Sequence, residues 1–392
     1  MSLHLFLPRV SILSTLLVAA CGSEQPDGDR SPAAGPLKTV SSTIPGWRIQ
    51  EVARVGGENA SESELLYTVP KVVEDAQGRF YVLNAGNRNV LAFDSSGKYL
   101  RTIGKPGTGP GELLVPGAIV PVGDDALLVL DVQQSRISEF RRSDGTFVQT
   151  IPTSFASGSL RDLRATAGGV LFVEVQELAD PARGVSVTTK SKIARLDVKS
   201  GELTPLVELD SVSRFQVSQD TENGRATRFL DRPFTPTPTW DVDTQGTVLF
   251  GNGAQFTVYR ATSEGVRPAF HVQGEAKPVT DEDRQTYIEQ RKLEAAAGEI
   301  EFPSRKPHFS RLLFDSEGLV WMLVPTHGSR QIWEVRDHAG RKAGEVALPE
   351  ESRLVGLSPT SLYVIRWNED DVETLFKYRV ERSVASRDQS RP

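Results

Sequence analysis

The stretch Val72-Val-Glu-Asp-Ala-Gln-Gly-Arg-Phe-Tyr-Val-Leu83, followed by Asn89-Val-Leu-Ala-Phe-Asp-Ser-Ser-Gly-Lys-Tyr-Leu-Arg-Thr-Ile103, decides the fold of this chain. It contains four short apolar segments separated by turns. After a glycine-rich bridge at 104–113, the same order returns and ends at Ile151. A unit that repeats in this way must stack on its neighbours to bury its apolar faces. The pattern therefore predicts an array of four-stranded β-sheets, each about 45 residues long.

Four further units are indicated along the rest of the chain. Their first apolar segments lie near Leu163, Trp240, Leu312 and Leu354. The last unit supplies only three strands. The alternating segment 47–55 has no unit of its own, so we expect it to complete the last sheet. The predicted domain is an all-β ring of six sheets over 47–382, closed by an N-terminal strand and followed by a polar tail at 383–392.

The turns within the units share the pattern Asp-x-x-Gly. An aspartate at the first position of a type I turn accepts backbone hydrogen bonds, and a glycine at the fourth takes the backbone conformation that follows. Dispersed acidic metal ligands are the alternative interpretation. The pattern occurs at Asp75 to Gly78, Asp94 to Gly97, Asp243 to Gly246, Asp315 to Gly318 and Asp337 to Gly340.

Two insertions interrupt the repeat. In residues 208–239, Asn223-Gly224 predicts the turn of a hairpin, which we interpret as a projecting flap. In residues 271–308, a helix is expected to begin after Thr280 and to end at Gly298. This segment contains few large apolar residues, which favours a solvated decoration over a partner-binding helix.

The N-terminus differs from the rest of the chain. Residues 1–20 carry one arginine and an apolar run that is too short to span a bilayer, as in a cleavable signal peptide. Cys21, the only cysteine, follows Val18-Ala-Ala20 in a way that resembles the lipobox of bacterial lipoproteins. The resemblance implies that Cys21 is lipidated, and Gly22 after it favours the outer membrane over the inner one. Residues 21–46 read as a flexible tether.

Composition and charge exclude several classes of protein. The chain has 392 residues, 38% of them hydrophobic, which is enough to bury a large core. Its formal charge of -6 contains no long basic run, so a nucleic-acid role is not expected. A single cysteine allows no internal disulfide. We expect a monomer that contacts the membrane through its anchor only.

The glycine-rich bridge at 104–113, followed by Pro116, by Leu128-Val-Leu-Asp131 and by Arg136-Ile-Ser-Glu-Phe140, resembles the NHL-repeat type of six-bladed β-propeller. The resemblance is good over 72–151 and weaker elsewhere. It implies a radial array of blades around a central channel, with ligands or partner proteins bound by the loops of the rim. The bridge lacks the ending of a phosphate-binding loop and is interpreted as a connection between blades.

Candidate ligand-binding residues follow the second strands of several units. They are Asn84, Asn87, Asp131 and Asn252, together with Arg330 in a later loop. By resemblance to propeller hydrolases and lactonases, the asparagines and Asp131 could hold calcium at the channel. Asparagines that accept left-handed loop conformations are the other interpretation.

The histidines offer a second metal alternative. His271 and His308 flank the predicted helix, and His327 lies in a later loop, so the three could share zinc as in NHL-type lyases. Their spacing matches no metal motif, and no nucleophile elbow is present. The sequence thus predicts a membrane-anchored propeller of the cell envelope that binds a protein or small molecule without a cofactor. The alternative is a lyase or lactonase with zinc or calcium in the channel.

Overall fold

A computed structural model describes residues 39–41, 47–153, 158–166, 168–177, 188–221, 224–291, 293, 298, 300–326, 330–368 and 370–382. The predicted signal peptide, Cys21, His327 and the polar tail lie outside the described residues. Three residues of the predicted tether form β1 (Thr39–Ser41), which pairs with the edge of β2 (Trp47–Gly56). An open strand edge can pair with a short extended segment in this way, and the rest of the predicted tether lies outside the described residues.

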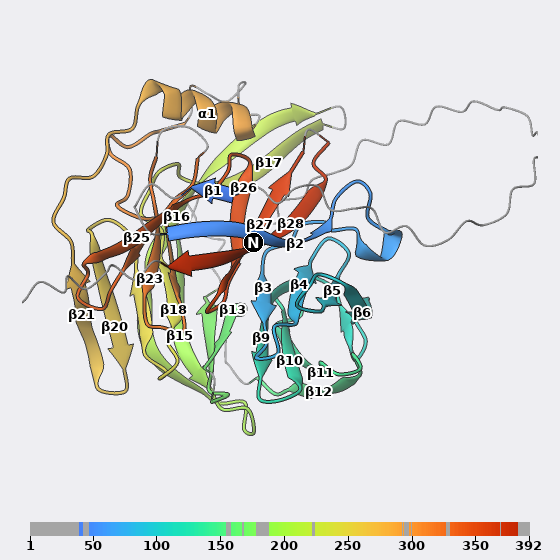
Figure 1. Cartoon of the computed structure of the whole chain (residues 1–392). Coiled ribbons are helices and arrows are strands. Elements are labelled where there is room, and N and C mark those ends of the chain that lie inside the picture. Colours follow the sequence, from blue (N-terminus) through green and yellow to red (C-terminus); the bar gives the residue numbers. More distant parts are fainter. Residues whose placement is uncertain are drawn as a thin grey trace, which may run out of the picture.

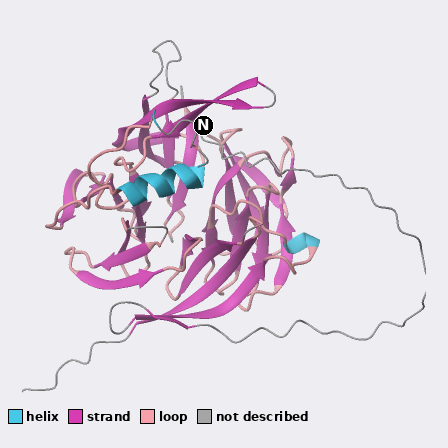
Figure 2. Ribbon diagram, turned by 90° about the horizontal axis from the view of Figure 1, so that it is seen from above, coloured by secondary structure: helices cyan, strands magenta, loops and turns pink. Residues whose placement is uncertain are grey.

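The described strands form six sheets arranged as blades around a common axis, which is a six-bladed β-propeller (Figures 1 and 2). Blade 1 comprises β3 (Val72–Glu74), β4 (Phe80–Asn84), β5 (Asn89–Phe93) and β6 (Tyr99–Ile103). Blade 2 comprises β9 (Pro116–Val122), β10 (Ala126–Asp131), β11 (Arg136–Arg141) and β12 (Phe147–Ile151). Between them, β7 (Lys105–Pro106) pairs with β8 (Glu112–Leu113), so the glycine-rich bridge is a connection between blades.

The next three blades continue the same order. Blade 3 comprises β13 (Ser159–Ala165), β14 (Leu171–Gln176), β15 (Thr188–Leu196) and the long β16 (Leu203–Thr221), to which β17 (Gly224–Asp231) adds a fifth strand. Blade 4 comprises β18 (Thr239–Val242), β19 (Val248–Gly251), β20 (Thr257–Thr262) and β21 (Gly265–His271). Blade 5 comprises β22 (Arg311–Phe314), β23 (Val320–Val324), β24 (Ile332–Arg336) and β25 (Lys342–Ala347).

Blade 6 closes the ring and joins the two ends of the domain. It contains β26 (Ser352–Leu357), β27 (Ser361–Trp367) and β28 (Glu373–Arg382), and β2 is its fourth strand. The pairing of β2 with β28 runs antiparallel from Trp47 opposite Arg382 to Gly56 opposite Thr374. Ring closure by the N-terminal segment is therefore confirmed.

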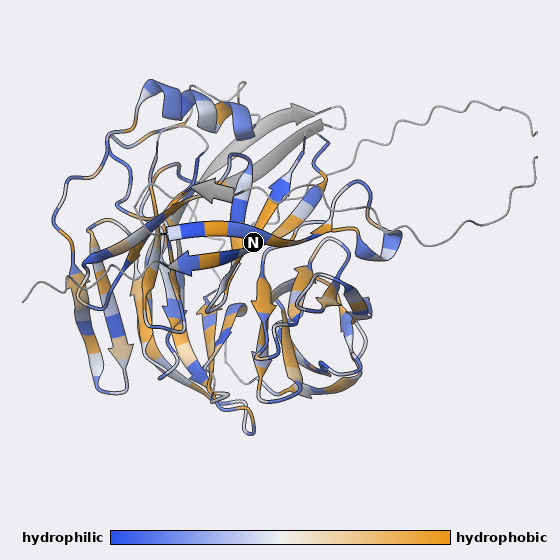
Figure 3. Cartoon of the chain, in the orientation of Figure 1, coloured by the Kyte–Doolittle hydropathy of each residue, from blue (hydrophilic) through white to orange (hydrophobic). Residues whose placement is uncertain are grey.

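The apolar core lies between the blades. Six clusters of buried side chains each join one pair of neighbouring blades around the ring. The cluster between blades 5 and 6 contains Trp321 and Trp333, both fully buried, with Trp47 from the closing strand. In Figure 3 the hydrophobic colour follows the strands of the blades. Each blade thus buries its two faces against its neighbours, as the repeat required.

All five Asp-x-x-Gly turns have the predicted geometry. In each one the aspartate carboxylate accepts hydrogen bonds from the backbone N–H groups two and four residues later, at 2.7–3.1 Å. The glycine has a positive φ, between 77° and 91°. These five carboxylates are therefore used by their own turns.

The two faces of the ring differ in what they carry. Strands alternate in direction, so the connections between blades lie on the same face as the loops between second and third strands. We call this the connection face. The extension of β16 with β17 and the helix α1 (Asp281–Arg291) both lie there, at the top of Figure 1. The other face carries the tight turns.

The two insertions pack against each other. The hairpin predicted at Asn223-Gly224 is formed by β16 and β17, with Thr221 opposite Gly224. An apolar cluster joins Leu230 of β17 to Ile288, Leu293 and Ile300 of the second insertion. The helix is therefore more than a solvated decoration, although most of its surface is hydrophilic (Figure 3).

The helix begins as predicted and ends early. Thr280 caps its first turn: the Thr280 hydroxyl accepts from Asp283 N at 3.2 Å, and the Asp283 carboxylate accepts from Thr280 N at 2.9 Å. The end at Gly298 was wrong, since α1 ends at Arg291. Beyond it Leu293 N donates to Ile288 O and the Leu293 side chain is buried in the cluster, so burial of Leu293 turns the chain out of the helix. In the part of the chain described, no helix is long and apolar enough to cross a bilayer.

Candidate functional site

Six charged side chains converge at the axis of the ring, and we call them the axial cluster. All come from the first strands of the blades or from the residue just before one. They are Lys71 beside β3, Asp162 and Arg164 on β13, Asp241 on β18, Arg311 on β22 and Arg353 on β26. Blade 2 adds no charge, because its first strand reads Pro116-Gly-Ala-Ile-Val-Pro-Val122.

Arg164 holds the acidic part of the axial cluster together. Its guanidinium binds Asp162 through one nitrogen and Asp241 at 3.0 Å through another, and so joins blade 3 to blade 4. The side chains of Arg164, Asp162 and Asp241 remain 17%, 27% and 13% exposed. Water therefore reaches the middle of the ring.

The other three cations bind backbone carbonyls across blade boundaries. Arg311 Nη1 donates to Leu354 O at 3.0 Å, Arg353 Nη2 to Val69 O at 3.0 Å, and Lys71 Nζ to Leu163 O at 3.2 Å. The Nε of Arg353 is buried without a hydrogen-bond partner in the described structure. None of the three forms an ion pair with a carboxylate among the described residues.

Burial and mutual repulsion shift the pKa values of these groups. Burial, followed by the charge of Arg164, lowers the pKa of Lys71 to about 8. Burial, followed by Arg164 and Arg353, lowers the pKa of Arg311 to about 10. Burial opposes ionisation of Asp162, but Arg164 and Lys71 hold the pKa of this carboxyl below its usual range. The cluster thus contains cations whose charge is costly in the free protein.

The stability of the protein should depend on pH through Lys71. The folded chain releases the Lys71 proton near pH 8, whereas the unfolded chain keeps it until about 10.5. The unfolded state binds more protons in this window, so stability rises with pH. We expect the wild type to gain up to about 3 kcal/mol relative to Lys71→Met between pH 7 and pH 10.5. Urea denaturation of both proteins measures this, and a stability difference that does not change with pH would refute the lowered pKa.

Two of the sequence-predicted ligand residues support the chain that enters a blade. Asn84, fully buried at the end of β4, accepts from Tyr67 N at 2.7 Å and donates to Leu65 O at 2.9 Å. Asp131, at the same place in blade 2, accepts from Leu114 N at 2.6 Å and from Gln134 N at 3.0 Å. These contacts give both residues a structural role, and binding of a ligand by them stays a prediction.

The remaining predicted ligand residues lie apart from the axial cluster. Asn87 shares Leu65 O with Asn84, at 3.3 Å, and the amide of Asn252 donates to Asp210. Arg330 lines a hollow of about 780 Å³ between α1 and the loops of blades 5 and 6. The hollow is lined by Lys277, Glu282, Thr286, Glu289, Gln290, Thr326, Arg330, Ile332, Glu350 and Glu351. None of these residues belongs to the axial cluster.

The histidines proposed as zinc ligands are only partly described. The Nδ1 atom of His271 lies 2.8 Å from the Thr257 hydroxyl, and His308 stacks on Phe256 with ring centroids 5.2 Å apart. Burial, and then the nearby His271, lower the pKa of His308. His327 lies outside the described residues. Within the described ranges, no three His, Cys, Asp or Glu side chains form a group that could hold a metal.

Sequence reasoning missed the axial cluster. Its signal was present, because Ser159-Leu-Arg-Asp-Leu-Arg-Ala165 places charges inside a strand whose neighbours are apolar. The first strands of the blades lie nearest the axis, but this follows only once the strand order is known.

Comparison with known proteins supports the fold. The family model DUF5128, described as a 6-bladed beta-propeller, matches residues 61–196. A protein of Bacteroides fragilis NCTC 9343 described as exported is 13% identical, with a TM-score of 0.52 over 87% of this chain and 97% of that one. A member of the DUF4221 family from Bacteroides vulgatus is 11% identical, with a TM-score of 0.51 over 86% and 99%. No curated protein matches the chain. These likenesses concern the fold alone.

Proposed function

We propose that this protein is a lipid-anchored propeller of the bacterial cell envelope that binds a ligand at the axial cluster. The proposal rests on one observation: charged side chains from five blades meet at an axis that water reaches. Partly buried charges that no ion pair compensates lower stability, so a ligand that compensates them gains binding energy. The ligand would enter from the connection face, where the loops and both insertions lie.

The second part of the proposal concerns the cellular location of the protein. Val18-Ala-Ala-Cys21 resembles a lipobox, and a similar solved structure is described as an exported protein. We propose that Cys21 carries the lipid and that the outer membrane holds the anchor. The chain between Cys21 and β2, the strand that closes the ring, would then link the propeller to the lipid anchor.

Replacing Cys21 with serine tests the anchor. The wild-type protein is expected to fractionate with membranes and to carry an acyl mass on its N-terminal peptide. The lipobox-like run ends at Cys21, and the sequence contains no other cysteine that could carry this lipid. Cys21→Ser should lose the acyl mass and leave the membrane fraction after signal processing. An unmodified Cys21 in the wild type would refute the anchor and leave the fold untouched.

Binding at the axis is tested by thermal denaturation with three small probes of different charge: inorganic phosphate, spermidine and glucose. At least one probe should raise Tm, since binding to the native state stabilises it. The rise should disappear in Arg353→Gln and remain in Arg379→Gln, which changes an exposed arginine on β28. If no probe raises Tm, or if both variants respond like the wild type, the axis is not the binding site.

A further inference from the structure

The axial cluster has more hydrogen-bond donors than acceptors. An arginine carries five N–H donors and a lysine three. For Lys71, Arg311 and Arg353 the described structure uses one side-chain donor each, always on a backbone carbonyl. The buried Nε of Arg353 has no partner in the described structure. The cluster therefore has N–H donors left over, and these suit a ligand that accepts hydrogen bonds.

The charge balance points the same way. Arg164 is matched by Asp162 and Asp241, while Glu373 is the carboxylate whose charge acts on Arg353. The axial cluster thus holds four cations and two carboxylates, and burial raises the pKa of both carboxylates beside it, Glu174 and Glu373. Glu373 accepts a hydrogen bond from Val69 N at 2.9 Å, and burial raises the pKa of its carboxyl, which further weakens the negative side. Within the axial cluster positive charge is in excess, and at Arg311 the repulsion by Arg164 and Arg353 outweighs the attraction by Asp162 and Asp241.

The excess cations are gathered on one side of the axis. Arg311, Arg353 and Lys71 belong to blades 5, 6 and 1, which are consecutive in the closed ring. Arg311 is the first residue of β22, Arg353 the second of β26, and Lys71 directly precedes β3. First strands begin at the connection face, so the three side chains lie toward the face from which a ligand would enter.

From this arrangement we propose that Lys71, Arg311 and Arg353 bind an anionic group of the ligand, either a carboxylate or a phosphate. The inference rests on the proposed binding function and names the chemical class that the axis takes. Guanidinium groups suit both anions because their planar donors match two oxygens at once. An anion bound there would accept hydrogen bonds from the side-chain N–H groups that do not bind backbone carbonyls. Its negative charge would also reduce the repulsion between Arg311 and Arg353.

Isothermal titration calorimetry of the full-length protein tests the proposal. Sodium phosphate and sodium acetate are titrated separately, each against sodium chloride at equal ionic strength. We expect saturable binding of at least one of them, and the one that binds identifies the phosphate or the carboxylate class. Arg311→Gln should weaken this binding by about tenfold or more, because hydrogen bonds to charged groups contribute strongly. Arg311→Lys keeps the charge and should weaken it less.

Arg379→Gln is the matched control, since it removes one positive charge from an exposed site. Equal weakening by Arg379→Gln and Arg311→Gln would show diffuse screening and overturn the proposal. So would the absence of saturable binding of either anion by folded wild-type protein. If spermidine or glucose raises Tm through Arg353 while neither anion binds, the axis binds a ligand but the anion assignment is wrong. If no probe acts at the axis, the proposed function fails as well.

Discussion

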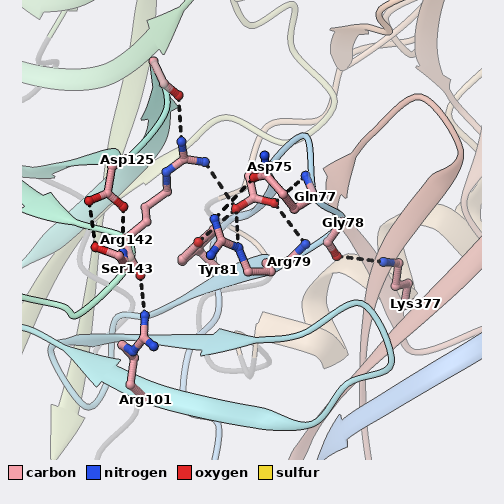
Figure 4. A network of polar contacts seen from close by, with 11 residues as sticks. Asp75, Gln77, Gly78, Arg79, Tyr81, Arg101, Asp125, Arg142, Ser143 and Lys377 are labelled. Atoms are coloured by element: carbon pink, nitrogen blue, oxygen red, sulfur yellow. Dashed lines mark hydrogen bonds and ion pairs between the residues drawn. The ribbon is translucent and has the colours of Figure 1, made fainter.

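Replacing Asp75 with alanine is expected to destabilise the protein by about 3–5 kcal/mol, because it leaves a buried cation without its carboxylate. Asp75 is buried between blades 1 and 2 (Figure 4). Its carboxylate accepts from Tyr81 Oη at 3.0 Å and binds Arg79 Nε at 2.8 Å and Arg142 Nη1 at 3.3 Å. Arg142 is only 3% exposed and has one other side-chain contact in the described structure, on Gly123 O at 2.7 Å.

Asp94→Ala is the matched control for Asp75→Ala. Asp94 occupies the same position of the same turn pattern, but among the described residues the hydrogen bonds to its carboxylate come from the turn itself, from Ser96 and Lys98. We expect a loss of about 1 kcal/mol there. Urea denaturation measures both changes. Similar losses would show that the turn, rather than the contact between blades, accounts for the role of Asp75.

Trp47→Ala should have a comparable effect, about 3–5 kcal/mol, because it removes a large side chain from the interface that closes the ring. Trp47 is 7% exposed at the start of β2 and meets Trp321 of blade 5 edge to face, with ring centroids 5.7 Å apart. Its indole lies over Gly344 of β25, where an added Cβ would come within 2.5 Å of the ring. Trp47 therefore joins the closing strand to the preceding blade.

The neighbouring residue provides the control for Trp47→Ala. Arg48 follows on the same strand and is exposed, so Arg48→Ala keeps the backbone pairing and the apolar interface. We expect a change within about 0.5 kcal/mol. Chemical denaturation followed by tryptophan fluorescence compares the two. If Trp47→Ala were as mild as Arg48→Ala, backbone pairing alone would close the ring.

The fold could be predicted because the features that specify it lie close together in the sequence. Alternating apolar strands, Asp-x-x-Gly turns and the missing fourth strand of the last unit are all visible along the chain. Ring closure by 47–55 followed from counting strands, and β2 confirms it. The end of the helix could not be found in this way, since it depends on where Leu293 packs.

The axial cluster could not be predicted, because it joins residues far apart in sequence. The charges of Lys71 and Arg311 come close enough to repel each other only when the first strands of all six blades surround one axis. Asn84 and Asp131 each end the second strand of a blade, so their places in the two blades are equivalent. What the sequence did not show is that backbone groups of the entering chain occupy their polar atoms.

The central claim is that the axis is a positively charged site that solvent and small anions reach, and thiol labelling tests it most directly. In a Cys21→Ser background, Thr239→Cys places a single thiol on the first strand of blade 4. The Thr239 hydroxyl accepts from Leu312 N at 3.0 Å, next to Arg311, and the substitution changes no charge of the cluster. Ser95→Cys, in an exposed turn of blade 1, serves as the reference thiol.

The measurement is the rate of modification by a negatively charged and by a positively charged methanethiosulfonate reagent. For each thiol we take the ratio of its rate with the negative reagent to its rate with the positive reagent. This ratio should be higher for the thiol at position 239 than for the reference thiol at position 95, and added salt should reduce the difference. A preference for the positive reagent, or no reaction with either, would contradict the account.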